Sequence, residues 1–299
     1  MVSSSLTPAS ISAEAFGALL ARYPGVIAAV SEAKGARPGQ KSLAELDAFR
    51  YSEAPSLFGR SGGRAMTKPD VLSLVDWKLR HGKFRPTLMK LVSSNDALLT
   101  QTVVEMAVSR YRSTISKNSE DAADVGDSRK LAGHVEAALA AVKEVSALKG
   151  VGPATASLLV AVHFPETCIF FSDEAYAWLA GGPRQSAPSK YNLKEYADVA
   201  RGMIQLLQQL PNEYGAQDVE QVAYVLMHDE KARSTGEENL AGKPTTNPSI
   251  KGTTKTTTPA KPTAAKSFPE SRKRKDPPTD AVAPLPSLDG PRRSSRHKS

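Results

Sequence analysis

The segment with the most chemical content is residues 148–159, LKGVGPATASLL, in which two glycines flank one apolar residue. Gly150 and Gly152 permit a tight hairpin, and Pro153 suits the first turn of a following helix, where no backbone N–H is needed as a donor. The free N–H groups and the positive dipole end of that helix attract anions. The segment therefore predicts a phosphate-binding turn, although the same turn could simply connect two packed helices.

A carboxylate, Asp173, stands 21 residues after Gly152 in the segment 170–174, FFSDE. Such a group can activate water, or stabilise a cationic sugar while a base departs, as carboxylates do in glycoside hydrolysis. The structural alternative is that Ser172 caps a helix beginning at Asp173, because the dipole stabilises acidic residues in a first turn without any catalytic role. The sequence leaves both interpretations open.

A cluster of cations lies in residues 76–86, DWKLRHGKFRP. Its members are Lys78, Arg80, Lys83 and Arg85. So dense a cluster in a nearly neutral region is consistent with a surface that faces phosphates or a partner. The alternative is an ordinary solvated helix end, where basic side chains suit the negative end of the dipole. We interpret His81, within the cluster, as structural.

Together, these three segments resemble the helix-hairpin-helix DNA glycosylase superfamily. In that family an aspartate follows the hairpin at a similar distance, at the mouth of a cleft between two helical lobes. Residues 76–86, 148–157 and 170–179 are most similar to the Amun-type branch, which contains glycosylase-like proteins regarded as nuclear. The resemblance covers residues 67–228 and leaves the C-terminal tail unmatched.

The resemblance implies an all-α, two-lobed fold with the helix-hairpin-helix at residues 140–163, and double-stranded DNA as the partner. It implies catalysis by Asp173 and DNA contacts from the basic cluster and the hairpin. The hairpin residues concerned are Gly150, Val151, Gly152, Ala154 and Thr155. A catalytically inactive adaptor, which binds DNA or a chromatin or repair protein through the same surfaces, is the alternative.

Ala154 departs from the pattern of the bifunctional members of the superfamily, which carry a lysine two residues after the second glycine. A methyl group cannot attack the sugar to form a Schiff base. Ala154 therefore predicts a monofunctional N-glycosylase without lyase activity. The single cysteine, Cys168, excludes an internal disulfide, Cys-ligated zinc and the iron–sulfur branch, and we expect no cofactor or metal.

The basicity of the chain is concentrated in its last 64 residues. Residues 236–299 contain thirteen basic and six acidic side chains, a net charge of +7 out of +8 for the whole chain. They hold ten of the 21 prolines and one aromatic residue, so they cannot bury enough apolar surface to fold. We predict a disordered tail whose cluster Arg272, Lys273, Arg274 and Lys275 is a nuclear-import signal, and hence a nuclear protein.

Helical periodicity dominates the rest of the chain. We therefore predict an all-α domain over residues 12–235, preceded by a flexible leader, residues 1–11. No apolar run approaches the roughly 20 residues that a membrane helix needs, so no membrane segment is expected.

The helix boundaries that hold the candidate site are marked by individual residues. Thr67 with Asp70 predicts a helix start, and Gly82 predicts a left-handed C-cap at its end. Two later helices are predicted from about residue 193, ending before Pro211, and over residues 216–228.

Overall fold

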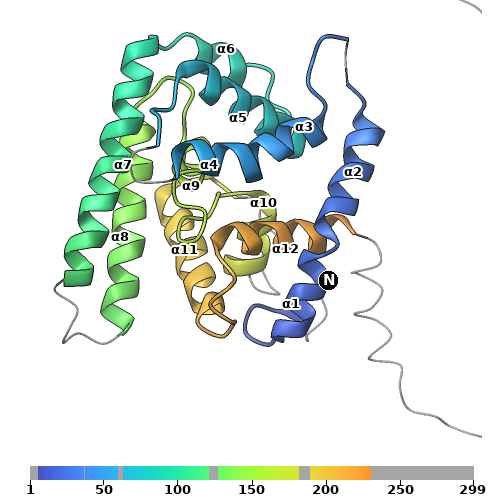
Figure 1. Ribbon diagram of the computed structural model, residues 1–299, viewed down its shortest axis with the longest axis vertical. Helices are drawn as coiled ribbons and strands as arrows, with labels where there is room; N and C mark the ends of the chain where they lie inside the picture. The colour runs from blue at the N-terminus through green and yellow to red at the C-terminus, as the bar shows by residue number, and fades with distance from the viewer. Residues whose placement is uncertain (1–5, 37, 60–62, 121–126, 182–188, 230–299) are drawn as a thin grey trace, which may run out of the picture. The chain divides into compact units, whose positions relative to one another are not determined.

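The chain folds into helices joined by short connections, as the computed structural model in Figure 1 shows. The structure describes residues 6–36, 38–59, 63–120, 127–181 and 189–229. Within these ranges there is no β-strand, which confirms the prediction of an all-α fold. The predicted tail and its import signal lie outside the described residues, as do residues 1–5 of the predicted leader.

The helices follow one another in this order: α1 (Ala13–Leu20), α2 (Tyr23–Lys34), α3 (Leu43–Ala48), α4 (Ala54–Phe58), α5 (Lys68–His81), α6 (Leu88–Ser93), α7 (Ala97–Glu120), α8 (Asp127–Val145), α9 (Pro153–Ala161), α10 (Asp173–Ala175), α11 (Leu193–Leu207) and α12 (Ala216–His228). Two π-helical turns, η2 (Phe49–Glu53) and η4 (Tyr176–Ala180), continue α3 and α10. The two predicted later helices are α11 and α12.

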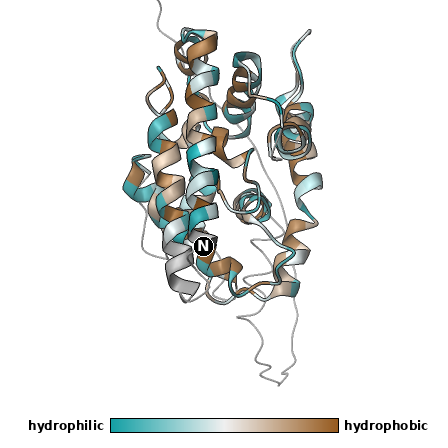
Figure 2. Cartoon of the chain, turned by 60° about the vertical axis from the view of Figure 1, so that its left-hand side comes forward, coloured by the Kyte–Doolittle hydropathy of each residue, from teal (hydrophilic) through white to brown (hydrophobic). Residues whose placement is uncertain are grey.

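Helix α9 forms the centre of the core. All eight of its residues from Ala154 to Ala161 are buried, and α5, α7, α8 and α11 pack around it. The long helices α7 and α8 lie side by side along one edge (Figure 1), and hydrophobic and hydrophilic residues alternate along the helices (Figure 2), as expected of amphipathic helices that bury one face. The hairpin that precedes α9 is therefore attached to the most deeply buried helix.

Helix α5 begins as predicted and ends differently. Asp70 accepts hydrogen bonds from the backbone N–H of Thr67 at 2.8 Å and from its hydroxyl at 2.6 Å, which fixes the start of the helix. Gly82 has φ −107°, outside the left-handed region, so the predicted left-handed C-cap is wrong. The helix end needs no positive φ because Gly82 N–H still bonds to the Lys78 carbonyl.

The N-terminal residues that are described pack onto the domain. Ile11 is buried, and the Leu6 carbonyl accepts a hydrogen bond from Trp178 Nε1 at 2.9 Å. Where a flexible leader is predicted, residues 6–11 are thus held by the core.

Residues 13–34 are long and apolar enough, by length and composition, to cross a membrane. They form two helices, α1 and α2, whose apolar residues Phe16, Leu19, Tyr23 and Ile27 are buried in the domain. Packing against α12 thus accounts for part of this apolar character. The absence of a membrane segment stays a prediction.

A buried ion pair joins η2 to α12. Arg50 Nη2 donates to Glu220 Oε2 at 2.9 Å, and their side chains are 0% and 2% exposed. The guanidinium carbon lies 4.7 Å from the ring centroid of Tyr51 and 5.6 Å from that of Trp77. Arg50 Nε and Nη1 have no hydrogen-bond partner among the described residues, so Glu220 and the two rings compensate its charge.

The same carboxylate holds the segment that leads to Asp173. Glu220 Oε1 accepts the backbone N–H of Phe170 at 2.6 Å, and Ser157 Oγ, on α9, accepts the N–H of Phe171 at 2.9 Å. These two buried bonds fix residues 170–171 between α12 and α9, because an unpaired buried N–H is costly.

Glu220→Gln should lower the free energy of unfolding by about 3–5 kcal/mol, because it leaves the buried guanidinium of Arg50 without its counter-charge. Urea denaturation followed by circular dichroism measures this loss. Asp198→Asn is the matched control. Asp198 pairs with Arg201 at the surface, where the side chains are 44% and 57% exposed, so the loss there should stay below about 1 kcal/mol. Equal small losses in both variants would show that the buried pair does not support the fold.

Candidate functional site

The hairpin before α9 needs its first glycine for structural reasons. Gly150 has φ +74°, and a Cβ there would lie 2.6 Å from Leu91 Cβ on α6. Asn95 holds the hairpin from the same side: its Oδ1 accepts the N–H of Lys149 at 2.8 Å, and its Nδ2 donates to the Lys149 carbonyl at 2.9 Å. Gly150 is therefore explained by the turn and by its close approach to α6.

Gly152, by contrast, has no structural need to be glycine. Its φ of −91° suits any residue, and a Cβ there would meet nothing within 4 Å. The N–H groups of Gly152 and Ala154 donate to no acceptor among the described residues, and they lie at the N-terminus of α9. Both residues line a groove, and unpaired amides at a helix N-terminus are suited to an anion.

The side chains of the other predicted hairpin contacts point inward. Val151, Ala154 and Thr155 are buried, with 3%, 6% and 3% of their surface exposed. Any ligand of the hairpin is consequently bound by the backbone, and these three side chains serve mainly to anchor it.

A groove brings the hairpin together with part of the basic cluster. Its volume is about 310 Å³. It is lined by Lys78, Arg85, Leu88, Gly150, Gly152, Pro153, Ala154, Thr155 and Tyr191. Two segments that the sequence marks independently, residues 78–85 and 150–155, thus face the same space, and the groove combines two cationic side chains with free backbone N–H groups.

The four predicted cations do not share one surface. Lys78 and Arg85 line the groove, whereas Lys83 lies at the neighbouring pocket of Asp173. Arg80 lines a different cavity, where its guanidinium bonds to Asp76 at 3.0 Å and to the Lys41 carbonyl at 2.8 Å. Arg80 is thereby engaged in tying α5 to the connection before α3.

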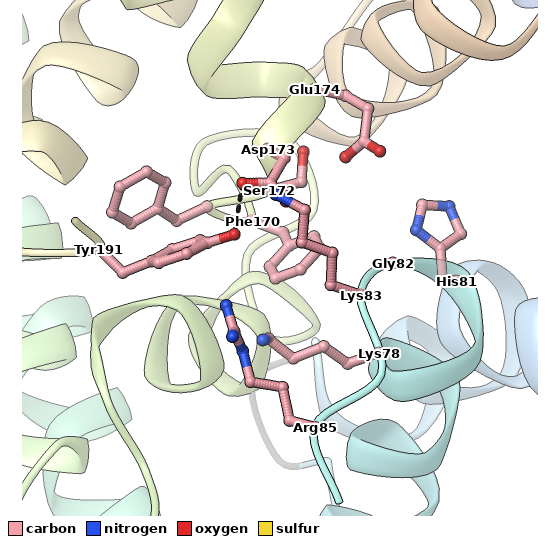
Figure 3. Close-up of a pocket in the computed structure, with 11 residues that line it drawn as sticks. Lys78, His81, Gly82, Lys83, Arg85, Phe170, Ser172, Asp173, Glu174 and Tyr191 are labelled. Carbon is pink, nitrogen blue, oxygen red and sulfur yellow. Dashed lines mark hydrogen bonds and ion pairs between the residues drawn. The ribbon is translucent and has the colours of Figure 1, made fainter. Parts of the chain in front are cut away.

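Asp173 begins α10, in a position set by Ser172 (Figure 3). Ser172 Oγ accepts the N–H of Ala175 at 2.9 Å, as its predicted capping role requires. Asp173 Oδ2 pairs with Lys83 Nζ at 3.1 Å, and Oδ1 accepts a hydrogen bond from the Tyr191 hydroxyl. The Asp173 side chain is 30% exposed, so the carboxylate is accessible but shared between a cation and a phenol.

Tyr191 is the site residue that the sequence does not reveal. Its φ of +54° lies in the left-handed region, which is uncommon for a residue other than glycine. Burial, together with the hydrogen bond to Asp173, raises the pKa of its hydroxyl. Its ring centroid lies 5.6 Å from the Arg85 guanidinium carbon. No motif or periodicity marks Tyr191, because its role comes from contacts with residues far away in the chain.

The pocket at Asp173 is small. Its volume is about 30 Å³, roughly the room of one water molecule, and it cannot hold a nucleobase in this conformation. Tyr191 lines both the pocket and the groove. Lys78 and Arg85 also line both, so the pocket and the groove adjoin one another.

A second carboxylate, Glu174, also lines this pocket and was not singled out in the sequence. Burial works to raise the pKa of Glu174, but the hydrogen bond from His228, at 2.9 Å, holds it below its usual value. His228 thus engages Glu174, which leaves Asp173 as the carboxylate facing the cations of the pocket.

Lys78 and His81, one helical turn apart on α5, have unusual electrostatic surroundings. Burial and the nearby Arg85 lower the pKa of Lys78 to about 8, against the opposing effect of Asp173. Burial lowers the pKa of His81 to about 3. The His81 ring stacks on Trp77 with centroids 4.4 Å apart, and its Nε2 has no hydrogen-bond partner among the described residues. These contacts support the structural interpretation of His81.

Among the residues that the structure describes, no group of three or more His, Cys, Asp or Glu side chains could hold a metal ion. That no cofactor is needed stays a prediction.

Acidification should destabilise the protein through His81. The folded state keeps this ring neutral down to about pH 3, whereas the unfolded chain protonates it below its ordinary pKa of 6.5, so stability is lost as the pH falls between these values. The free energy of unfolding of the wild type, relative to that of the variant His81→Leu, should fall by up to about 1.4 kcal/mol for each pH unit below 6.5.

Urea denaturation at pH 4.5 to 7.5 measures this difference. The control is Leu99→Ala, which removes an exposed apolar side chain. Its free energy of unfolding should differ from that of the wild type by the same amount at every pH. If the difference in free energy of unfolding between the wild type and His81→Leu does not change with pH, His81 is not a neutral, buried side chain.

Comparison with known proteins identifies no family. A scan against protein-family models, a search of curated proteins and a search of solved structures each found no match. The resemblance to helix-hairpin-helix glycosylases thus remains a prediction that rests on the residues of the three segments.

Proposed function

We propose that this chain is a nuclear protein that binds double-stranded DNA through a two-lobed, glycosylase-type helical fold, and that it removes a base by hydrolysing the N-glycosidic bond. The observation that carries the proposal is the groove in which the amides of the hairpin meet Lys78 and Arg85, next to the pocket of Asp173. The nuclear location rests on the cluster at residues 272–275, whose replacement by alanines in a fluorescent fusion tests it.

The groove suits a DNA phosphate in both charge and shape. Gly152 and Ala154 offer unpaired N–H groups at the positive end of α9, and the missing side chain at Gly152 lets an oxygen approach them. Lys78 and Arg85 add two cations on the facing element, and neutralisation of phosphates releases counterions. The remainder of the domain is nearly neutral, so these local charges set where the duplex lies.

Asp173 supplies the chemistry of base removal. As the bond between base and sugar breaks, positive charge develops on the sugar. A carboxylate beside the sugar stabilises this charge or orients the attacking water. Lys83 and Tyr191 hold the carboxylate before substrate binds. Tyr191 must release its hydrogen bond before that oxygen of Asp173 can take another partner.

A catalytically inactive adaptor for chromatin or repair proteins is the second candidate. The small pocket of about 30 Å³ favours it, because Asp173 already has two partners there. Large apolar side chains also remain exposed where a protein could bind. They include Phe84 and Leu98, each 72% exposed, and Leu99 and Met106, 52% and 51% exposed.

Arg85→Ala should weaken binding to a duplex and reduce the slope of log Kd against log salt by about 1, because one fewer phosphate is neutralised. Gly152→Val should also weaken binding, since the branched side chain occupies the space in front of the free amides while the backbone conformation tolerates it. Fluorescence anisotropy at several salt concentrations measures both effects. Arg201→Ala, at an exposed pair on α11, is the control and should change neither value. Wild-type affinity and slope in both groove variants would place the DNA elsewhere.

Asp173→Asn should reduce base excision by at least about 100-fold while affinity for the duplex changes little, because the amide keeps the shape and removes the charge. A panel of lesion-bearing duplexes, with alkaline cleavage of the abasic product, measures the excision rate. Asp198→Asn is the matched surface control. Undiminished excision by Asp173→Asn would refute its catalytic role. Tight binding without excision on any lesion would favour the adaptor.

A further inference from the structure

A separate cavity lies where the C-terminal ends of α2 and α5 meet the starts of α3 and α6. Its volume is about 460 Å³, larger than that of the hairpin groove and within the roughly 300–1,000 Å³ usual for ligand pockets. In Figure 1, α3 and α5 lie between α6 and α2. We call this space the α2–α5 cavity, and its principal lining residues are Lys34, Leu43, Leu79, Arg80, Phe84 and Met89. No residue that lines it also lines the groove or the pocket of Asp173, so the proposed DNA site does not account for it.

The α2–α5 cavity combines an apolar interior with an exposed aromatic side chain. Leu43 and Leu79 are 1% and 7% exposed, Met89 is half-buried, and Phe84 is 72% exposed. The Phe84 ring has no ring or cation partner among the described residues. Water covers this apolar surface in the free chain, so a ligand that buries it gains free energy.

The charges around the cavity are predominantly positive. Two of its lining side chains, Lys34 and Arg80, are cations, and its one lining carboxylate, Asp76, already accepts a hydrogen bond from Arg80 at 3.0 Å. Lys34 donates to the Arg80 carbonyl and forms no ion pair with any residue that the structure describes. Lys90, exposed beside Met89, likewise has no ion pair within the described ranges. A ligand with carboxylates would neutralise this unpaired charge.

This combination of side chains is typical of a protein-binding surface. Interface cores are enriched in aromatic residues, Met and Arg, and apolar anchors fill pockets there while charged groups stay at the rim. A DNA phosphate suits the cavity less well. The Arg80 guanidinium already bonds to three groups of the chain, on Asp76, Lys41 and Gln40, and the interior is apolar.

We propose that the α2–α5 cavity binds an acidic segment of a partner protein, which inserts one large apolar side chain. The inserted side chain packs on Leu43, Leu79 and Phe84, and the acidic residues that flank it face Lys34. The proposal does not depend on the proposed function. Phe84 lines the cavity whereas Arg85, the next residue, lines the hairpin groove, so a partner bound here lies beside the duplex rather than in its place.

The experiment selects peptides from a random library displayed on phage, with the full-length protein as the target. Enriched sequences are determined, and a representative peptide is synthesised with a fluorescent label. Its Kd is measured by fluorescence anisotropy for the wild type and for variants. Binding of a labelled duplex is measured for the same proteins.

Enriched peptides should combine a large apolar residue with several Asp or Glu residues. Phe84→Ala should raise the Kd of the peptide by at least about tenfold, because it removes the apolar contact, and should leave duplex binding within about twofold of the wild type. Lys34→Glu should raise the peptide Kd by at least about fivefold, because it repels the carboxylates. Both side chains are exposed, so the variants should fold, which circular dichroism verifies.

Leu98→Ala and Lys117→Glu are the matched controls. Leu98 is 72% exposed, as Phe84 is, and Lys117 is an exposed lysine. Both lie on α7, none of whose residues lines the cavity. Each control should bind the peptide within about twofold of the wild type.

Three outcomes would overturn the proposal. Absence of any enriched sequence, or enrichment of peptides without acidic residues, refutes an acidic partner. Peptides that bind Phe84→Ala as tightly as the wild type occupy another surface, such as residues 236–299. Weaker duplex binding by Phe84→Ala, with peptide binding unchanged, assigns the cavity to DNA.

Discussion

The buried pair of Arg50 and Glu220 is the interaction on which the site depends. Glu220 neutralises a guanidinium that would otherwise be buried alone, and it also accepts the N–H of Phe170. With Ser157 holding Phe171, this bond sets where the chain enters α10 and therefore where Asp173 stands. One carboxylate from α12 thus stabilises the core and positions the candidate catalytic residue.

The same network also fixes the opposite side of the site. The Arg50 guanidinium lies over Trp77, whose indole Nε1 donates to the buried Asp47 at 2.8 Å. Trp77 precedes Lys78, so the rotation of α5 that buries the indole determines which way the lysine projects.

The groove and the pocket form one unit. In it, cations of α5 and of the following connection face the amides of α9 and the carboxylate of α10. Tyr191 lines both cavities, and its left-handed backbone conformation is a local cost that the hydrogen bond to Asp173 helps to offset.

Local signals predicted the elements well, and long-range contacts determined what could not be predicted. Features that depend on a few neighbouring residues were predicted correctly. They are the helices α11 and α12, the start of α5 at Thr67 and Asp70, and the cap at Ser172. The prediction of a left-handed cap at Gly82 was wrong, because Gly82 has a negative φ of −107° and its N–H still bonds to the Lys78 carbonyl. Arg80 shares a segment with Lys78 but faces another cavity, since successive positions on a helix point in different directions. Arg50 and Glu220 are 170 residues apart, and no pattern in the chain pairs them.

We propose above that the hairpin amides and the basic residues of α5 bind the phosphates of one DNA strand. Amide hydrogen exchange of the full-length protein, measured by NMR with and without an abasic-site duplex, tests this most directly. The N–H groups of Gly152 and Ala154, which have no acceptor among the described residues, should exchange rapidly in the free protein and become markedly slower in the complex. Protection confined to residues 236–299, with the exchange of Gly152 and Ala154 unchanged, would show that the hairpin does not bind the DNA.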